Sequence, residues 1–187
     1  LNKDKYAFNL MVDHKLNEAD VYYKTFRSNH FKWDNYQFEK QQITFIGSEF
    51  YINALDVKLT ANAKLYNNFI YFDTLALPAQ QNKNETTSTF MAEKGYKFKN
   101  VHFKTALIYQ LTSDRYILPM PTYAGRQIVY YENRIFKKAM KIRVGFNLTY
   151  SSKFYGYEFM PSISQFYAQN TTKIGDYPFV DFFVSTH

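Results

Sequence analysis

The sequence predicts an all-β protein, specifically a transmembrane antiparallel up-and-down β-barrel or part of one, and three observations lead to this fold class. Apolar residues recur at every second position over several long segments, which is the periodicity of a strand with two different faces. Aromatic residues are abundant, with 18 Tyr and 19 Phe against 1 Trp, as in the aromatic girdles of membrane barrels. No run of about 18 apolar residues occurs, so a transmembrane helix is excluded.

The segment MKIRVGFNLTY, residues 140 to 150, shows the alternation most plainly. As a helix it would scatter its apolar residues around the whole surface, because two-residue steps rotate by about 200°. As a strand it has one apolar and one basic face, and we expect the apolar face to contact lipid, since a Lys or Arg there would cost about 2 to 4 kcal/mol near the bilayer midplane. The predicted lipid-facing residues are Met140, Ile142, Val144, Phe146 and Leu148, and the predicted lumen-lining ones are Lys141 and Arg143.

Two other segments repeat this pattern at the length that crosses a bilayer, about 9 to 11 tilted residues. In ALDVKLTANAKLY (54 to 66), Val57 and Leu59 should face lipid while Lys58 and Lys64 line the interior. In NVHFKTALIYQL (100 to 111), Lys104 should line the interior. Two further strands are expected at 5 to 12, which is short for a membrane strand, and at 41 to 52, whose register stays open because its pattern is mixed.

The segments between the strands are predicted from their turn residues. Residues 78 to 95 lack apolar periodicity and are expected to form a long exposed loop, and residues 113 to 125 contain two prolines, which do not suit a central strand. Short links at 132 to 135 and 151 to 156 are expected to be hairpins. A turn at residues 175 to 178 should lead into a strand with Val180, Phe182 and Val184 on one face.

The charge and the reactive side chains argue against nucleic-acid binding and against catalysis. The net charge is +7, but the 23 Lys and Arg residues are scattered through the alternating segments, so no nucleic-acid partner is expected. The 4 His residues are dispersed and Cys is absent, so no metal ligands and no cofactor are predicted. No catalytic residue is predicted, although an outer-membrane barrel enzyme such as a lipase is an alternative.

Several motifs resemble those of the putative porin family of Bacteroidota. They are the WDN element within NHFKWDN (29 to 35), IYFD within LYNNFIYFD (65 to 73), YYE followed by FKKA (130 to 139), and QFYAQN followed by KIGDYPFVD (165 to 181). The resemblance implies an outer-membrane β-barrel acting as a passive pore. Members of that family are much longer, and this chain ends in FFVSTH without a terminal aromatic residue, so we expect a C-terminal portion of a longer barrel, with roughly eight to ten strands present.

Together these observations predict one outer-membrane β-barrel region over residues 1 to 187, without a domain boundary. Its expected function is passive diffusion of small solutes through a positively lined aqueous lumen in the outer membrane of a Gram-negative bacterium. The expected partners are membrane lipids, including anionic lipopolysaccharide, and possible other outer-membrane proteins. Two alternatives stay open: a plugged barrel that serves a larger envelope complex, and a soluble β-sandwich binding module, which shows the same alternation.

Overall fold

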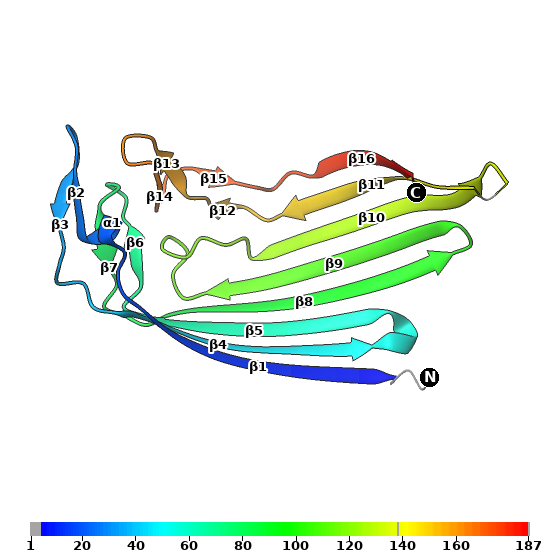
Figure 1. The fold of residues 1–187 in the computed structure, drawn as a ribbon, viewed down its shortest axis with the longest axis horizontal. Helices are drawn as coiled ribbons and strands as arrows, with labels where there is room; N and C mark the ends of the chain where they lie inside the picture. Colours follow the sequence, from blue (N-terminus) through cyan, green and yellow to red (C-terminus); the bar gives the residue numbers. More distant parts are fainter. Residues whose placement is uncertain (1–4, 138, 187) are drawn as a thin grey trace.

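One eight-stranded antiparallel sheet dominates the computed structural model, which describes residues 5–137 and 139–186 (Figure 1). The order of the strands in the sheet follows their order in the chain, so the connectivity is up-and-down. The strands are β1 (Tyr6–Asn17), β4 (Gln41–Ile52), β5 (Val57–Asn67), β8 (Glu85–Phe98), β9 (Val101–Thr112), β10 (Tyr123–Ile135), β11 (Met140–Ser151) and β16 (Phe179–Thr186). The all-β, antiparallel and up-and-down parts of the prediction are therefore confirmed.

The two outer strands of this sheet are β1 and β16, and they do not pair with each other. The sheet is thus open over the described residues, and the predicted closure into a barrel is not found in it. No helix within residues 5–137 and 139–186 has the length and apolarity needed to span a membrane.

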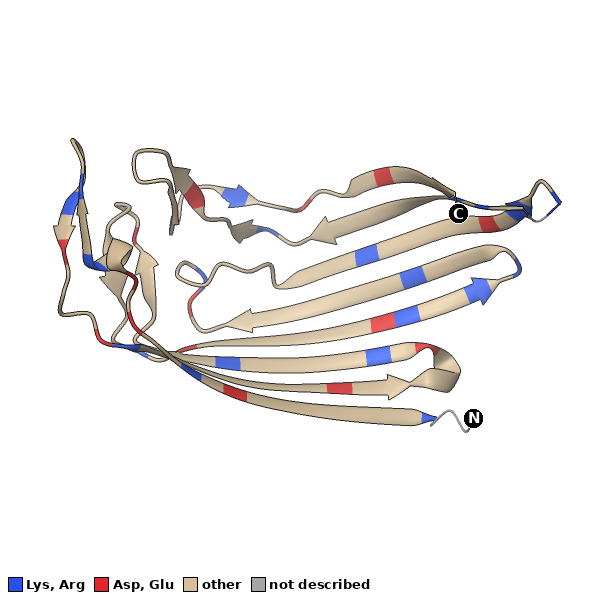
Figure 2. Ribbon diagram, viewed as in Figure 1, with Lys and Arg blue, Asp and Glu red and all other residues tan. Residues whose placement is uncertain are grey.

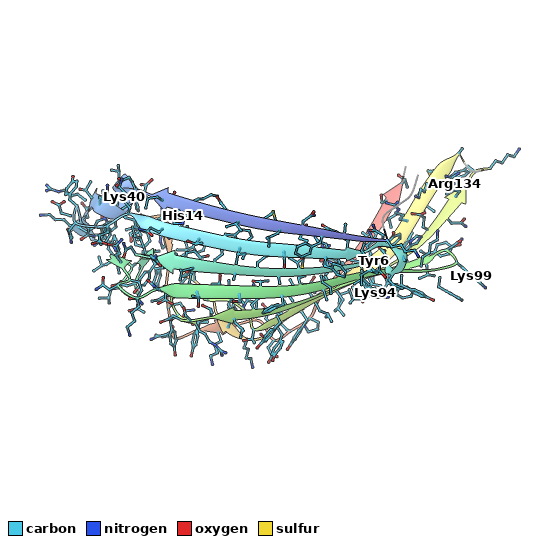
Figure 3. The ribbon with its side chains drawn as sticks, turned by 90° about the horizontal axis from the view of Figure 1, so that it is seen from below. Tyr6, His14, Lys40, Lys94, Lys99 and Arg134 are labelled. Carbon is cyan, nitrogen blue, oxygen red and sulfur yellow. The ribbon has the colours of Figure 1, made fainter. Side chains whose placement is uncertain are left out.

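The two ends of the sheet differ in the length of their connections. At one end, β4 and β5 are joined through the short 3-10 helix η1 (Asn53–Leu55), β8 and β9 through Lys99 and Asn100, and β10 and β11 through residues 136–139. At the other end, the connections are residues 18–40, 68–84, 113–122 and 152–178. Figure 3 places Lys99 and Arg134 at the short-turn end and His14 and Lys40 at the long-loop end.

Three of the long connections contain secondary structure of their own. Residues 18–40 form α1 (Val21–Lys24) and the hairpin of β2 (Thr25–Arg27) and β3 (Lys32–Asp34). Residues 68–84 form the pair β6 (Ile70–Phe72) and β7 (Pro78–Gln80). Residues 152–178 form β12 (Phe154–Tyr155), β13 (Glu158–Met160), β14 (Gln165–Tyr167) and β15 (Lys173–Ile174). We call these three connections together the loop cap, and it lies at one end of the sheet (Figure 1).

The loop cap has a small aromatic core. Trp33, Phe72, Ala76 and Ile163 are buried and pack against one another, although they come from three separate connections. The backbone N–H of Ala168 donates to the carbonyl oxygen of Phe72 over 2.8 Å. The cap is therefore a packed unit held by contacts between segments that are distant in sequence, and not a set of independent loops.

Three predicted connections were wrong. Residues 85–98 form strand β8 and are not an exposed loop, because Thr86, Ser88 and Ala92 occupy one face where large apolar residues would be expected and so hide the alternation. Residues 132–135 belong to the end of β10, so the turn comes afterwards. Residues 151–156 do not close a hairpin, since β11 pairs with β16 only after the excursion through the loop cap. The strand predicted at 5 to 12 runs on to Asn17.

Candidate functional site

The cross-strand pairing divides the large sheet into two faces of different chemistry. Residues directly opposite each other in an antiparallel pair point to the same side, and successive residues alternate. Across the sheet, Lys58 lies opposite Glu93, Glu93 opposite Ala106, and Ala106 opposite Arg126. We call the side that carries this row the polar face and the opposite side the apolar face.

The polar face carries nearly all charged side chains of the eight strands, and Figure 2 shows how these positions spread over the sheet. They are Asp13 and Lys15 in β1, Glu49 in β4, Lys58 and Lys64 in β5, Glu85, Glu93 and Lys97 in β8, Lys104 in β9, Arg126, Glu132 and Arg134 in β10, Lys141 and Arg143 in β11, and Asp181 in β16.

The structure brings the five residues predicted to line a lumen onto this one face, although they lie on three strands. Lys58 and Lys64 lie on β5, Lys104 on β9, and Lys141 and Arg143 on β11. Lys64 lies opposite Thr87, which is on the same side of β8 as Glu93. Arg143 lies opposite Glu132, which is on the same side of β10 as Arg126. That this side borders water in a lumen stays a prediction.

Two acidic residues hold three of these cations. The Lys58 ammonium lies 2.6 Å from a Glu49 carboxylate oxygen, and the Tyr51 hydroxyl donates to the other carboxylate oxygen over 2.7 Å. The Lys58 ammonium also lies 5.3 Å from the centre of the Tyr51 ring, at a distance where the face of the ring attracts a cation. Lys58 is thus held by neighbours from β4.

Glu132 forms the second acidic centre. One of its carboxylate oxygens lies 3.0 Å from the Lys141 ammonium and 2.6 Å from the Arg143 guanidinium Nε. The Arg143 guanidinium also lies 5.7 Å from the centre of the Tyr130 ring. One carboxylate therefore faces two cations, and this cluster keeps a net positive charge.

Other cations of the polar face, Lys64, Lys104 and Arg126 among them, lack such a partner in the described part of the chain. Within the described residues, no carboxylate oxygen lies within 4.0 Å of Lys64, Lys104 or Arg126. Arg126 donates from Nε to the Asn147 side-chain oxygen over 2.7 Å, and Lys64 lies 6.0 Å from the centre of the Phe45 ring. Sequence reasoning missed Arg126 because the strand around it, GRQIVYYENRI, mixes polar and apolar residues on both faces.

The apolar face carries the residues predicted to contact lipid. Val57 and Leu59 of β5 share it with the β11 residues, since Val57 connects through Lys94, Thr105 and Gln127 to Leu148. The five β11 residues on this face are Met140, Ile142, Val144, Phe146 and Leu148. Whether lipid covers them stays a prediction.

Large apolar side chains are uncovered on the apolar face. Phe8 is 63% exposed, Leu107 is 59% exposed and Phe182 is 82% exposed. Among the described strand positions of this face, Lys94 is the single Asp, Glu, Lys or Arg residue, and Figure 3 places it at the same end of the sheet as Tyr6. A soluble antiparallel sheet normally packs its apolar face against a core, and a continuous uncovered apolar surface marks an interaction with a partner or a membrane.

A metal centre is not found in the part of the chain that the structure describes, since no three His, Asp or Glu side chains gather to hold an ion. Of the four His residues, His102 stacks on Tyr130 with ring centres 4.6 Å apart, and His14 lies 3.0 Å from the Thr44 hydroxyl across the sheet. The His102 ring is thus packed against an aromatic neighbour, and the His14 ring is hydrogen-bonded across the sheet.

Fold and faces together define an all-β protein built on an up-and-down antiparallel sheet, with its charges collected on one side. The chain belongs to the family described as "Putative porin", whose family model matches residues 1–187. The resemblance drawn from the motifs is thereby confirmed, while an origin in Bacteroidota stays a prediction. No curated protein matched the sequence.

Proposed function

We propose that the chain forms an outer-membrane β-barrel region through which small solutes diffuse passively, in an aqueous lumen bordered by the polar face. The observation that carries the proposal is the separation of charge between the two faces. Asp, Glu, Lys and Arg occupy the polar face on all eight strands, whereas the apolar face has only Lys94 among its described strand positions. Lipid tolerates such an apolar face, and water fills the space beside a polar one.

The lengths of the strands support a membrane location. Seven of the strands have between 11 and 14 residues, and about 9 to 11 tilted residues suffice to cross a bilayer. Strands of soluble domains are mostly about 5 or 6 residues long. Short turns at one end and long connections at the other suit a barrel whose turns face the periplasm, so the loop cap is assigned to the extracellular side.

The proposal requires both sheet edges to be paired in the bilayer, because lipid offers no hydrogen bonds to a free strand edge. It also implies lipid partners for the apolar face, including anionic lipopolysaccharide in the outer leaflet. The description of the family is that of a pore and not of an enzyme, which supports a role without catalysis.

Conductance in planar bilayers under a salt gradient tests the proposal. The excess of cations on the polar face should give a reversal potential that favours anions, and a preference for cations would contradict this assignment of the lining. Protein that inserts into bilayers, conducts nothing and co-purifies with a fixed envelope partner would favour the plugged barrel. Protein that stays in the aqueous phase on detergent partitioning would favour the soluble β-sandwich.

A further inference from the structure

A hollow of about 540 Å³ opens on the polar face near the short-turn end, and none of the ion pairs described above fills it. Residues of β4, β5, β8, β9 and β10 line it, together with Asn53 and Asp56 from the turn between β4 and β5. Its floor is low where the small residue Ala106 lies in the middle, with charged residues on both sides.

Acidic groups lie on one side of this hollow. Glu93 projects from β8 beside Ala106. The Asp56 carboxylate lies directly over Gly95, because a side-chain carbon added to Gly95 would collide with the Asp56 oxygen Oδ2. The backbone N–H of Gly95 donates to the Asp56 carbonyl oxygen over 2.9 Å, which holds the turn, and with it the carboxylate, against β8.

Basic groups lie on the other side. Lys104 on β9 is opposite Gly95, and Arg126 on β10 is opposite Ala106. These two cations are diagonal neighbours on adjacent strands, close enough for long side chains to reach one solute group. Since strands are about 4.8 Å apart, Arg126 and Glu93 stand on strands roughly 10 Å apart, with Ala106 between them.

The four charged groups are available to a solute. Over the described residues, Asp56, Glu93, Lys104 and Arg126 have no oppositely charged group within 4.0 Å. Lys58 and Lys94 also line the hollow. Glu49 already binds the Lys58 ammonium, and Lys94 belongs to the opposite, apolar face. The Arg126 guanidinium uses its Nε for Asn147, so its terminal nitrogens keep their donors.

We propose that this hollow is a binding subsite for small zwitterionic solutes of the amino-acid class. The solute carboxylate would lie toward Lys104 and Arg126, and its ammonium group toward Glu93 and Asp56. A simple anion would meet two carboxylates and a simple cation two basic groups, so only a solute with both charges gains at both sides. The inference deepens the proposed function and rests on it, because the solute reaches the hollow through the lumen.

Binding to the detergent-solubilised full chain tests the subsite, by saturation-transfer NMR that observes the solute. The probes are β-alanine, which is a zwitterion, and its neutral isomer lactamide, with propionate and ethylammonium as the single charges. The saturation transfer to β-alanine is expected to exceed that to each of the other three several-fold. Replacement of Lys104 and Arg126 by Gln together, or Glu93→Gln alone, should lower it to the level of lactamide.

Two further variants separate the subsite from general effects of charge or folding. Ala106→Leu fills the hollow without changing its charge and should abolish the preference for β-alanine. Lys99→Gln removes one positive charge at the β8–β9 turn, outside the hollow, and should leave the preference intact. Far-UV circular dichroism of each variant shows whether the sheet has formed.

Equal saturation transfer to β-alanine and to lactamide would overturn the subsite. Saturation transfer that is larger to propionate than to β-alanine, and that increases further to propionate in Glu93→Gln, would also overturn it. The conductance of the native protein reports separately on the pore. Conductance without a preference for β-alanine rejects the subsite alone, whereas a preference for β-alanine without conductance rejects the pore and keeps the subsite.

Discussion

The indole N–H of Trp33 donates to the carbonyl oxygen of Tyr22 over 2.9 Å, and this bond ties β3 to α1 inside the loop cap. Trp33 is 7% exposed and is the only Trp of the chain. Its fluorescence therefore reports on the cap alone, without a contribution of another Trp from the sheet. The Tyr22 hydroxyl donates in turn to the carbonyl oxygen of Ile163. The Trp33 fluorescence therefore reports whether the connections 18–40 and 152–178 stay in contact.

Phe72→Ala should loosen the loop cap. Phe72 is 3% exposed and lies 6.0 Å from Trp33 between ring centres, and removal of a buried Phe side chain costs about 3 to 5 kcal/mol. We expect the Trp33 emission to shift to longer wavelength and its urea midpoint to fall. Phe166→Ala in the same cap is the matched control, because Phe166 is 63% exposed. Equal shifts in both variants would contradict the assigned core.

The loop cap should also lose stability in alkali. Burial raises the pKa of Tyr157 to about 12 from its usual value near 10, with a smaller contribution from Tyr23 and Tyr66, and its hydroxyl donates to the carbonyl oxygen of Ile117 over 2.5 Å. The unfolded chain loses this proton first as the pH rises. The stabilisation is therefore complete below pH 10 and is lost between about pH 10 and 12.

Trp33 emission during a pH titration measures this loss. The red shift of the Trp33 emission should grow between about pH 10 and 12 in the native protein. In Tyr157→Phe, the emission wavelength should rise less steeply with pH over this range. Some slope should remain, because burial also raises the pKa of Tyr22 and of Tyr23 in the cap. A Tyr157→Phe titration that follows the native curve throughout would remove Tyr157 from the explanation.

The strands β5 and β11 and their faces could be predicted from the sequence, because alternation is a local property that each strand carries by itself. The strand β8 could not, since the apolar face holds Thr86, Ser88 and Ala92 there, and such small or polar residues resemble a loop. The ion pairs of Glu132 depend on the register between β10 and β11, which the intervening turn sets. The loop cap depends on contacts between Trp33, Phe72 and Ile163, for which no periodicity exists.

Lysine substitutions at the middle of β5 should distinguish the two faces. Ala61 lies on the apolar face and Asn62 on the polar face. If lipid covers the apolar face, Ala61→Lys should cost about 2 to 4 kcal/mol, whereas Asn62→Lys should cost under about 1 kcal/mol, as surface substitutions usually do. Urea unfolding of protein refolded into lipid vesicles measures both values. Similar costs at the two positions would contradict the membrane assignment of the faces.

Two glycines of the sheet should respond differently to alanine. A methyl group on Gly145 would meet the carbonyl oxygen of Val129 and lie 2.6 Å from the Tyr130 Cβ and 2.7 Å from its Cα. Since backbone must shift, we expect Gly145→Ala to cost about 1 to 3 kcal/mol. A methyl group on Gly125 would make only ordinary van der Waals contacts, the nearest with the Leu107 side chain at 3.4 Å. Gly125→Ala should therefore be neutral or stabilise the fold by up to about 1 kcal/mol. The same urea assay measures both, and the reverse order would contradict the close approach of β10 and β11.

Glu132→Gln should change both the stability and the selectivity of a conducting protein. Glu132 holds Lys141 at 3.0 Å and Arg143 at 2.6 Å, so its loss leaves two neighbouring cations without their shared carboxylate. Their repulsion should lower the urea midpoint, and their free charge should move the reversal potential further toward anions.

The matched control is Glu158→Gln, which removes the same charge from β13 in the loop cap and not from the sheet. If the polar face borders the conduction path, the reversal potential should move more in Glu132→Gln than in Glu158→Gln, because the potential of a fixed charge falls off over a screening length of about 10 Å at 0.1 M salt. An equal shift in the two variants would mean that conducted ions do not pass along the polar face, even if the protein forms a pore.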